Sequence, residues 1–163
     1  MRKLITVIVV LATTIAMSGV AQGGSDKFRK TVFKARLSGA NEVPVVETET
    51  TGKARLVARG DSIAFELEVD DADAVFGAAG AHIHCAPAGE NGPVVAFLAG
   101  PVTGGFNGSV EVEATLTAAN ITNPACGADI AGLVEAMRQG RTYVTVHSTA
   151  FPGGVARGQI VKA

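Results

Sequence analysis

Three histidines are the residues of this chain with the clearest capacity for chemistry. His82 and His84 are two positions apart in a segment typical of a β-strand, so their side chains share one face, with Cα atoms about 6.6 Å apart. His147 lies in a later predicted strand. If the two strands are close, the three imidazoles converge, and imidazole is a ligand for both copper and zinc. We therefore hypothesise a site for one copper or zinc ion with an open coordination position.

A structural role is the alternative interpretation of the same histidines. In that interpretation they form a hydrogen-bonded trio that anchors the turns at residues 89–92 and 152–154. Catalytic chemistry of other kinds finds no support. His147 and Ser148 point to opposite faces of a strand, which excludes a nucleophile–base pair, and no glycine-rich phosphate loop opens a helix. We expect a binding or structural protein rather than an enzyme.

Charged residues supply two weaker hypotheses. Glu66 and Glu68, like Glu111 and Glu113, alternate with apolar residues, which indicates solvated strand faces rather than an acid–base pair. Glu42 and Arg157 lie beside turn motifs near opposite ends of the predicted domain. We therefore hypothesise an ion pair between Glu42 and Arg157 that joins the first and last strands.

The chain contains two cysteines, Cys85 and Cys126. In an oxidising compartment a single disulfide is the default for such a pair. Closing a loop of roughly 40 residues would stabilise the fold by about 4 kcal/mol in the chain-entropy model. Two free thiols, or Cys85 as a metal ligand beside the histidines, are the alternatives.

The amino-terminal segment is typical of a secretory signal. Two basic residues precede an apolar run that is too short to span a membrane, and small residues stand before a cleavage point after Ala21. We predict a signal peptide over residues 1–21, a flexible leader over 22–30, no membrane span after cleavage, and a secreted or periplasmic protein. The formal charge of -1 and the lack of a basic run argue against nucleic acid as a partner.

Alternation of apolar and polar residues predicts short antiparallel strands, bounded by turn residues, at 32–37, 52–59, 63–69, 80–85, 93–98, 109–116, 142–148 and 155–161. Asp70, Asp71 and Asp73 are expected in a solvated turn. The strand at 109–116 is expected to turn Val110, Val112, Ala114 and Leu116 inward. One short helix near 128–139 is predicted from apolar residues at helical spacing: Ile130, Leu133, Val134 and Met137. These elements indicate an all-β fold, an antiparallel Greek-key sandwich or barrel.

Several separated motifs, in order, resemble the chordin (CHRD) domain family, and the resemblance is to bacterial secreted single-domain members. The motifs cover residues 33–44, 81–84, 89–95, 140–148 and 157–160. The resemblance implies a CHRD domain over residues 31–163 that folds as an extracytoplasmic β-sandwich, either immunoglobulin-like or similar to Cu/Zn superoxide dismutase.

The family has no settled activity, although chordin itself binds secreted growth factors. The resemblance to Cu/Zn superoxide dismutase rests on His82, His84 and His147. A chain with three histidines cannot build the complete two-metal site of that enzyme. The resemblance thus implies a secreted binding or structural module with an unidentified protein or surface partner. The alternative is a mononuclear copper or zinc protein with a redox or metal-handling role.

Overall fold

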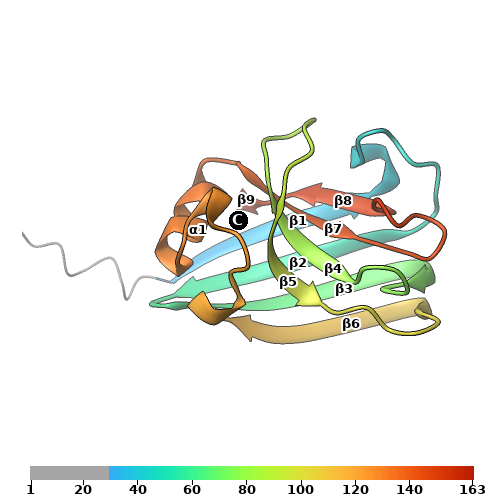
Figure 1. The fold of residues 1–163 in the computed structure, drawn as a ribbon, viewed down its shortest axis with the longest axis horizontal. Helices are drawn as coiled ribbons and strands as arrows, with labels where there is room; N and C mark the ends of the chain where they lie inside the picture. The colour runs from blue at the N-terminus through green and yellow to red at the C-terminus, as the bar shows by residue number, and fades with distance from the viewer. Residues whose placement is uncertain (1–29) are drawn as a thin grey trace, which may run out of the picture.

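The computed structural model describes residues 30–163, so the predicted signal peptide and nearly all of the predicted leader lie outside the described residues. The described part contains nine strands and one α-helix, α1 (Ile130–Arg138) (Figure 1). The strands are β1 (Thr31–Ser38), β2 (Thr51–Arg59), β3 (Ser62–Val75), β4 (Ala81–Cys85), β5 (Val94–Ala99), β6 (Phe106–Leu116), β7 (Thr142–Val146), β8 (Ala156–Gln159) and β9 (Val161–Lys162).

The strands form one antiparallel sheet with the neighbour order β5-β4-β7-β8-β1-β2-β3-β6, and β9 pairs with β1. The sheet curves so far that β5 and β6, at the two ends of this order, come into contact. An antiparallel sandwich or barrel with one short helix is therefore confirmed. The first predicted strand also lies beside a carboxyl-terminal one, because Ser38 pairs with Arg157.

Alternation along β2 and β3 builds much of the core. Leu56 of β2 lies opposite Phe65 of β3, and both side chains are buried. Polar residues between the buried positions face outward, as expected for a sheet with one solvated face. Burial of each large apolar side chain stabilises the fold by roughly 1.5–3 kcal/mol.

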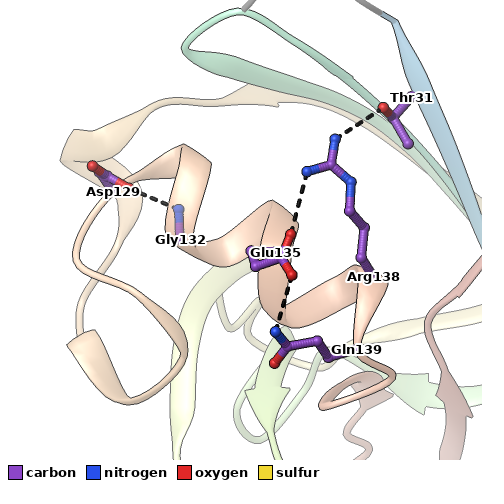
Figure 2. A network of polar contacts seen from close by, with 6 residues as sticks. All are labelled: Thr31, Asp129, Gly132, Glu135, Arg138 and Gln139. Atoms are coloured by element: carbon purple, nitrogen blue, oxygen red, sulfur yellow. Dashed lines mark hydrogen bonds and ion pairs between the residues drawn. The ribbon is translucent and has the colours of Figure 1, made fainter. Parts of the chain in front are cut away.

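Helix α1 closes one end of the sheet. Its N-cap is Asp129, whose carboxylate accepts a hydrogen bond from the Gly132 amide at 2.8 Å (Figure 2). Leu133 and Met137 are buried, as their helical spacing predicts. Arg138 donates to the hydroxyl of Thr31, which joins the helix to the start of β1. Within residues 30–163 no helix has the length and hydropathy that a membrane span requires.

One sequence prediction is wrong, and another is confirmed only in part. The acidic segment Asp70–Asp73 is not a turn, because β3 continues through it to Val75 with irregular pairing to β6, and Asp71 takes a positive φ of 51°. In β6, Val110, Val112 and Leu116 face the core as expected, but only Leu116 is fully buried, and Ala114 is exposed. The reason is that β6 lies at the end of the sheet order, where the opposite layer covers it incompletely.

Candidate metal centre

A layer of buried and half-buried polar side chains covers the outward face of β4, β7 and β8. Its members alternate with core-facing neighbours along these strands and the turn after β7: His82, His84, Tyr143, Thr145, His147, Arg157 and Gln159. We call these seven residues the polar layer. Between them, Ile83, Val144 and Val146 point into the apolar core. The histidines thus lie on the outer side of the sheet.

Pairing of β4 with β7 brings the three histidines together, as the sequence predicts. The register places His82 opposite Thr145, which is two residues before His147. Nδ1 of His82 lies 3.0 Å from Nε2 of His147. One ring nitrogen from each of His82, His84 and His147 lies within 4.8 Å of the others. The convergence therefore follows from strand register.

Backbone carbonyls determine which ring nitrogens of two histidines carry the proton. Nδ1 of His84 donates to the Gly92 carbonyl at 2.9 Å, and Nδ1 of His147 donates to the Pro152 carbonyl at 2.9 Å. Because a carbonyl can only accept, Nδ1 is the protonated nitrogen and Nε2 of each ring keeps its lone pair. Histidines that bind metals are commonly oriented by such a bond from the other ring nitrogen. These are also the turns that the structural interpretation assigned to the histidines.

All three imidazoles are neutral at pH 7. Burial lowers the pKa of His82 to about 4, with a further contribution from the neighbouring His147 and His84. Burial also lowers the pKa of His84 and of His147, although the hydrogen bonds to Gly92 and Pro152 act in the opposite direction. A neutral imidazole is the form that binds a metal, so few protons would compete with an ion near neutral pH.

Several polar atoms of the layer are buried without a hydrogen-bond partner. They include Nε2 of His82 and of His84, together with Oγ1 of Thr145 and Oε1 of Gln159. Buried polar groups are nearly always paired, so each of these atoms marks a position where water or an ion would bind. The two unpaired imidazole nitrogens are the donor type that copper and zinc prefer.

The separation between the ring nitrogens of His82 and His147 matches two ligands of one ion. Metal–nitrogen distances of about 2.0–2.1 Å and tetrahedral angles place two ligand nitrogens about 3.3 Å apart. The observed separation is 3.0 Å, with the His84 ring nitrogen within 4.8 Å of the pair. For an ion to bind there, Nδ1 of His82 would have to give up the proton that it donates to His147, and the His84 ring would have to approach the pair. One coordination position would then remain open.

Tyr143 connects the histidines to a buried arginine. Its ring stacks on His84 with centroids 4.9 Å apart, and the guanidinium carbon of Arg157 lies 3.4 Å from the same ring. Since β7 runs between β4 and β8, the two contacts approach the ring from neighbouring strands. The positive charge of Arg157 further lowers the pKa of His84. Tyr143 lies four residues before His147, so strand alternation places the two on one face, but alternation does not reveal this stack.

Arg157 does not form the predicted ion pair with Glu42. Its guanidinium donates to the Asn91 side chain and to the carbonyls of Pro87 and Glu90, so it holds the 87–91 loop over the polar layer. No ion pair within 4.0 Å joins Glu42 to Arg157 in the described part of the chain. Arg157 is only 2% exposed, which explains why its donors are committed to nearby carbonyls.

Glu42 is nevertheless buried near this arginine. Burial raises the pKa of its carboxyl to about 7, and the charge of Arg157 opposes that rise. Its Oε1 atom has no hydrogen-bond partner and lies against Gly154, where a Cβ atom would approach it to 2.6 Å. Glu42 therefore closes the polar layer from the side of the 39–50 loop, as an acid that is half protonated near neutral pH.

The two cysteines form the predicted disulfide. Cys85 bonds to Cys126 across a separation of 41 residues. Cys85 follows His84 directly at the end of β4, and Cys126 precedes α1 by a few residues. The bond excludes Cys85 as a thiolate ligand and anchors the strand that carries two of the three histidines.

Phe97 is a neighbour of the site that the sequence did not indicate. It lies opposite His82 in the pairing of β4 with β5, and its ring contacts the imidazole edge-on with centroids 4.5 Å apart. Although it is large and apolar, its side chain is 47% exposed. Phe97 therefore lies between His82 and solvent.

The glutamates remain apart from the polar layer. Glu66, Glu111 and Glu113 come together on the outer face of β3 and β6, where both β6 residues are exposed. This placement agrees with the solvated strand faces that their alternation predicts.

The fold and its motifs agree with a comparison against known families. The model of the CHRD domain matches residues 33–160. No curated protein and no solved structure is significantly similar to this chain. The family match spans all the strands except the last and includes the three histidines, both cysteines and Arg157. The chain therefore belongs to the CHRD domain family.

Proposed function

We propose that this protein is a secreted binding module that holds one copper or zinc ion through His82, His84 and His147. CHRD domains are extracellular modules. The predicted signal peptide over residues 1–21 and the Cys85–Cys126 disulfide are consistent with export of this chain to an oxidising compartment. A secreted or periplasmic location follows from this proposal.

The proposal rests on one combined observation: the three histidine rings converge, and backbone carbonyls fix the tautomers of His84 and His147. Three neutral imidazoles meet, and carbonyls take the Nδ1 protons of His84 and His147. Nε2 of His84 therefore has a free lone pair, and Nε2 of His147 accepts only the proton that it shares with His82. A trio whose role was purely structural would satisfy its own nitrogens. Here Nε2 of His82 and Nε2 of His84 are buried and have no partner.

Such a centre would bind one metal ion and leave one coordination position for a further ligand. Three imidazoles suit both copper and zinc, and the fourth position would take water or a donor from a partner molecule. We find no group in the polar layer that completes a catalytic set, so the proposal is metal handling rather than turnover.

Equilibrium dialysis against Cu(II) and Zn(II), with elemental analysis, tests the proposal. We expect one equivalent of metal in the wild-type protein and none in His84→Ala or His147→Ala. Glu111→Gln/Glu113→Gln is the matched control, because it removes carboxylates that lie outside the polar layer, and it should bind like the wild type. Urea unfolding of each variant checks that it is folded. Absence of metal from the wild type, with a loss of stability in the histidine variants, would leave the structural role instead.

A further inference from the structure

Strand β6 ends the sheet with one unpaired edge. It is 11 residues long, and among residues 30–163 β3 is its only strand partner. Figure 1 shows it as the lowest strand of the sheet, beside β3. The edge at the opposite end of the sheet order is partly covered, because Ile121 pairs with Ala96 of β5. β6 also comes into contact with β5, but no strand of the described residues pairs with its second edge. An unpaired edge of this length is a template for another strand.

The inner face of β6 is incompletely buried. Val110 and Val112 are half-buried and Ala114 is exposed, whereas Val69 and Leu67, which lie opposite the two valines on β3, are fully buried. Phe106, at the start of β6, is 41% exposed. The apolar side chains of β6 therefore have a neighbouring strand on one edge only, whereas every strand in the middle of the sheet has a neighbour on both edges.

The outer face of β6 ends two rows of charged residues. One row runs Lys34, Arg55, Glu66 and Glu113 across β1, β2, β3 and β6. The parallel row runs Arg36, Lys53, Glu68 and Glu111. Both rows change from basic on β1 and β2 to acidic on β3 and β6.

The acidic end of these rows lacks basic partners. Lys53 pairs with Glu68 at 2.7 Å, but no ion pair involves Glu111 or Glu113 in the described residues. Instead, carboxylate oxygens of Glu66, Glu111 and Glu113 lie within 4.8 Å of one another. Like charges opposite one another destabilise a strand pair, and opposite charges stabilise it. A strand added beyond β6 would relieve this repulsion if it placed basic residues beside Glu111 and Glu113.

We propose that the free edge of β6 binds an extended segment of a partner protein by strand addition, and that this segment alternates basic with apolar residues. The basic residues would face Glu111 and Glu113, and the apolar residues would cover Val110 and Val112. Main-chain hydrogen bonds supply affinity in this mode of recognition, and the alternating side chains supply specificity. A second copy paired through its own β6 does not fit, because its glutamates would add to the same acidic group.

The β2 segment of this chain provides a suitable probe. A synthetic peptide of residues 51–59 carries Lys53 and Arg55 on one face and Ala54, Leu56 and Ala58 on the other. In the native sheet this sequence already lies beside the acidic face of β3. Titration of the folded wild-type protein with this peptide, followed by backbone NMR shifts and amide exchange, locates and measures the binding.

We expect the peptide to protect amides of β6 and to bind at least tenfold more weakly to Glu111→Lys/Glu113→Lys. A peptide carrying Lys53→Glu and Arg55→Glu should bind the Glu111→Lys/Glu113→Lys protein more tightly than it binds the wild-type protein. The matched control, Glu47→Lys/Glu49→Lys, changes two exposed glutamates outside β6 and should not alter binding. No binding at millimolar peptide, protection confined to β1 or β3, or equal binding by the β6 variant would overturn the proposal. In those cases the role of Glu111 and Glu113 would be to prevent another strand from pairing with this edge.

Discussion

Nδ1 of His82 and Nε2 of His147 lie 3.0 Å apart, although 65 residues separate them in the chain. The carbonyl of Pro152 accepts the Nδ1 proton of His147, so a single proton lies between the two facing nitrogens. A metal ion bound between them would replace that proton. The same relationship explains why the pair is neutral, because burial and the neighbouring ring both lower the pKa of His82.

Gly92 is expected to be essential for the position of His84. A Cβ atom at Gly92 would come within 1.9 Å of the Cys85 carbonyl oxygen, and the Gly92 carbonyl accepts the His84 proton. Gly92→Ala should therefore lower the free energy of unfolding by about 2 kcal/mol or more and weaken metal binding. Urea unfolding and metal titration measure the two effects. Gly153→Ala, where no heavy atom lies within 4 Å of the added carbon, is the control and should change neither.

The metal-free protein is expected to lose stability in acid because of its histidines. The pKa of His82 is about 4 in the folded protein and 6.5 ordinarily, so the unfolded chain binds more protons between these values. This contribution is fully present above pH 6.5 and is lost as the pH falls through about 4. For His82 it is on the order of 3 kcal/mol. Urea unfolding from pH 7 to pH 4 measures it, and a smaller pH dependence in His82→Gln is expected.

Glu42 is expected to make the protein less stable as the pH rises, which is the opposite pH dependence to that of His82. Its pKa is about 7 in the folded protein and 4.5 ordinarily, so the folded state binds more protons between these values. The stability that it contributes is fully present below pH 4.5 and is lost as the pH rises through about 7. Glu42→Gln removes this loss, so it should gain stability relative to the wild type between pH 5 and pH 8, by on the order of 3 kcal/mol. A difference that does not vary with pH would contradict the burial of a titrating carboxyl.

The disulfide should stabilise both the fold and the histidine site. Cys85→Ala/Cys126→Ala opens a loop closed across 41 residues, and its loss should lower the free energy of unfolding by about 4 kcal/mol in the chain-entropy model. Because Cys85 follows His84, the variant should also bind metal more weakly. Denaturant titration with and without a reductant measures the effect, and the double variant should not respond to the reductant. Equal stability of the oxidised wild type and the variant would show that the bond contributes little.

The histidine site was predictable because strand geometry is periodic. His82 and His84 share a face for the same reason that Ile83 points into the core. The turn at 89–92 accepts the proton of His84, and the turn at 152–154 accepts that of His147. Two cysteines likewise had one simple pairing. These inferences needed only the local conformation of each segment and one correct strand pairing.

Position within the sheet was not predictable from the same periodicity. Alternation shows that Val110 and Val112 share a face, but it does not show whether another layer covers that face, and in β6 it is only partly covered. The Glu42–Arg157 hypothesis placed the first and last strands correctly, since Ser38 pairs with Arg157. It did not anticipate that carbonyls of the 87–91 loop would take the guanidinium donors. Loop positions depend on long-range packing, which a single sequence does not specify.

Long-range proton–nitrogen NMR of the imidazole rings tests the central claim most directly, because it reports the state of each ring nitrogen. In the metal-free protein at pH 7 we predict three neutral rings, with the proton of His84 and of His147 on Nδ1. One equivalent of Zn(II) should shift one nitrogen on each ring to a metal-bound frequency, with no further change at higher zinc. Ring nitrogens of His82, His84 and His147 that keep their metal-free frequencies at saturating zinc would contradict the account and make the histidines part of the structural framework.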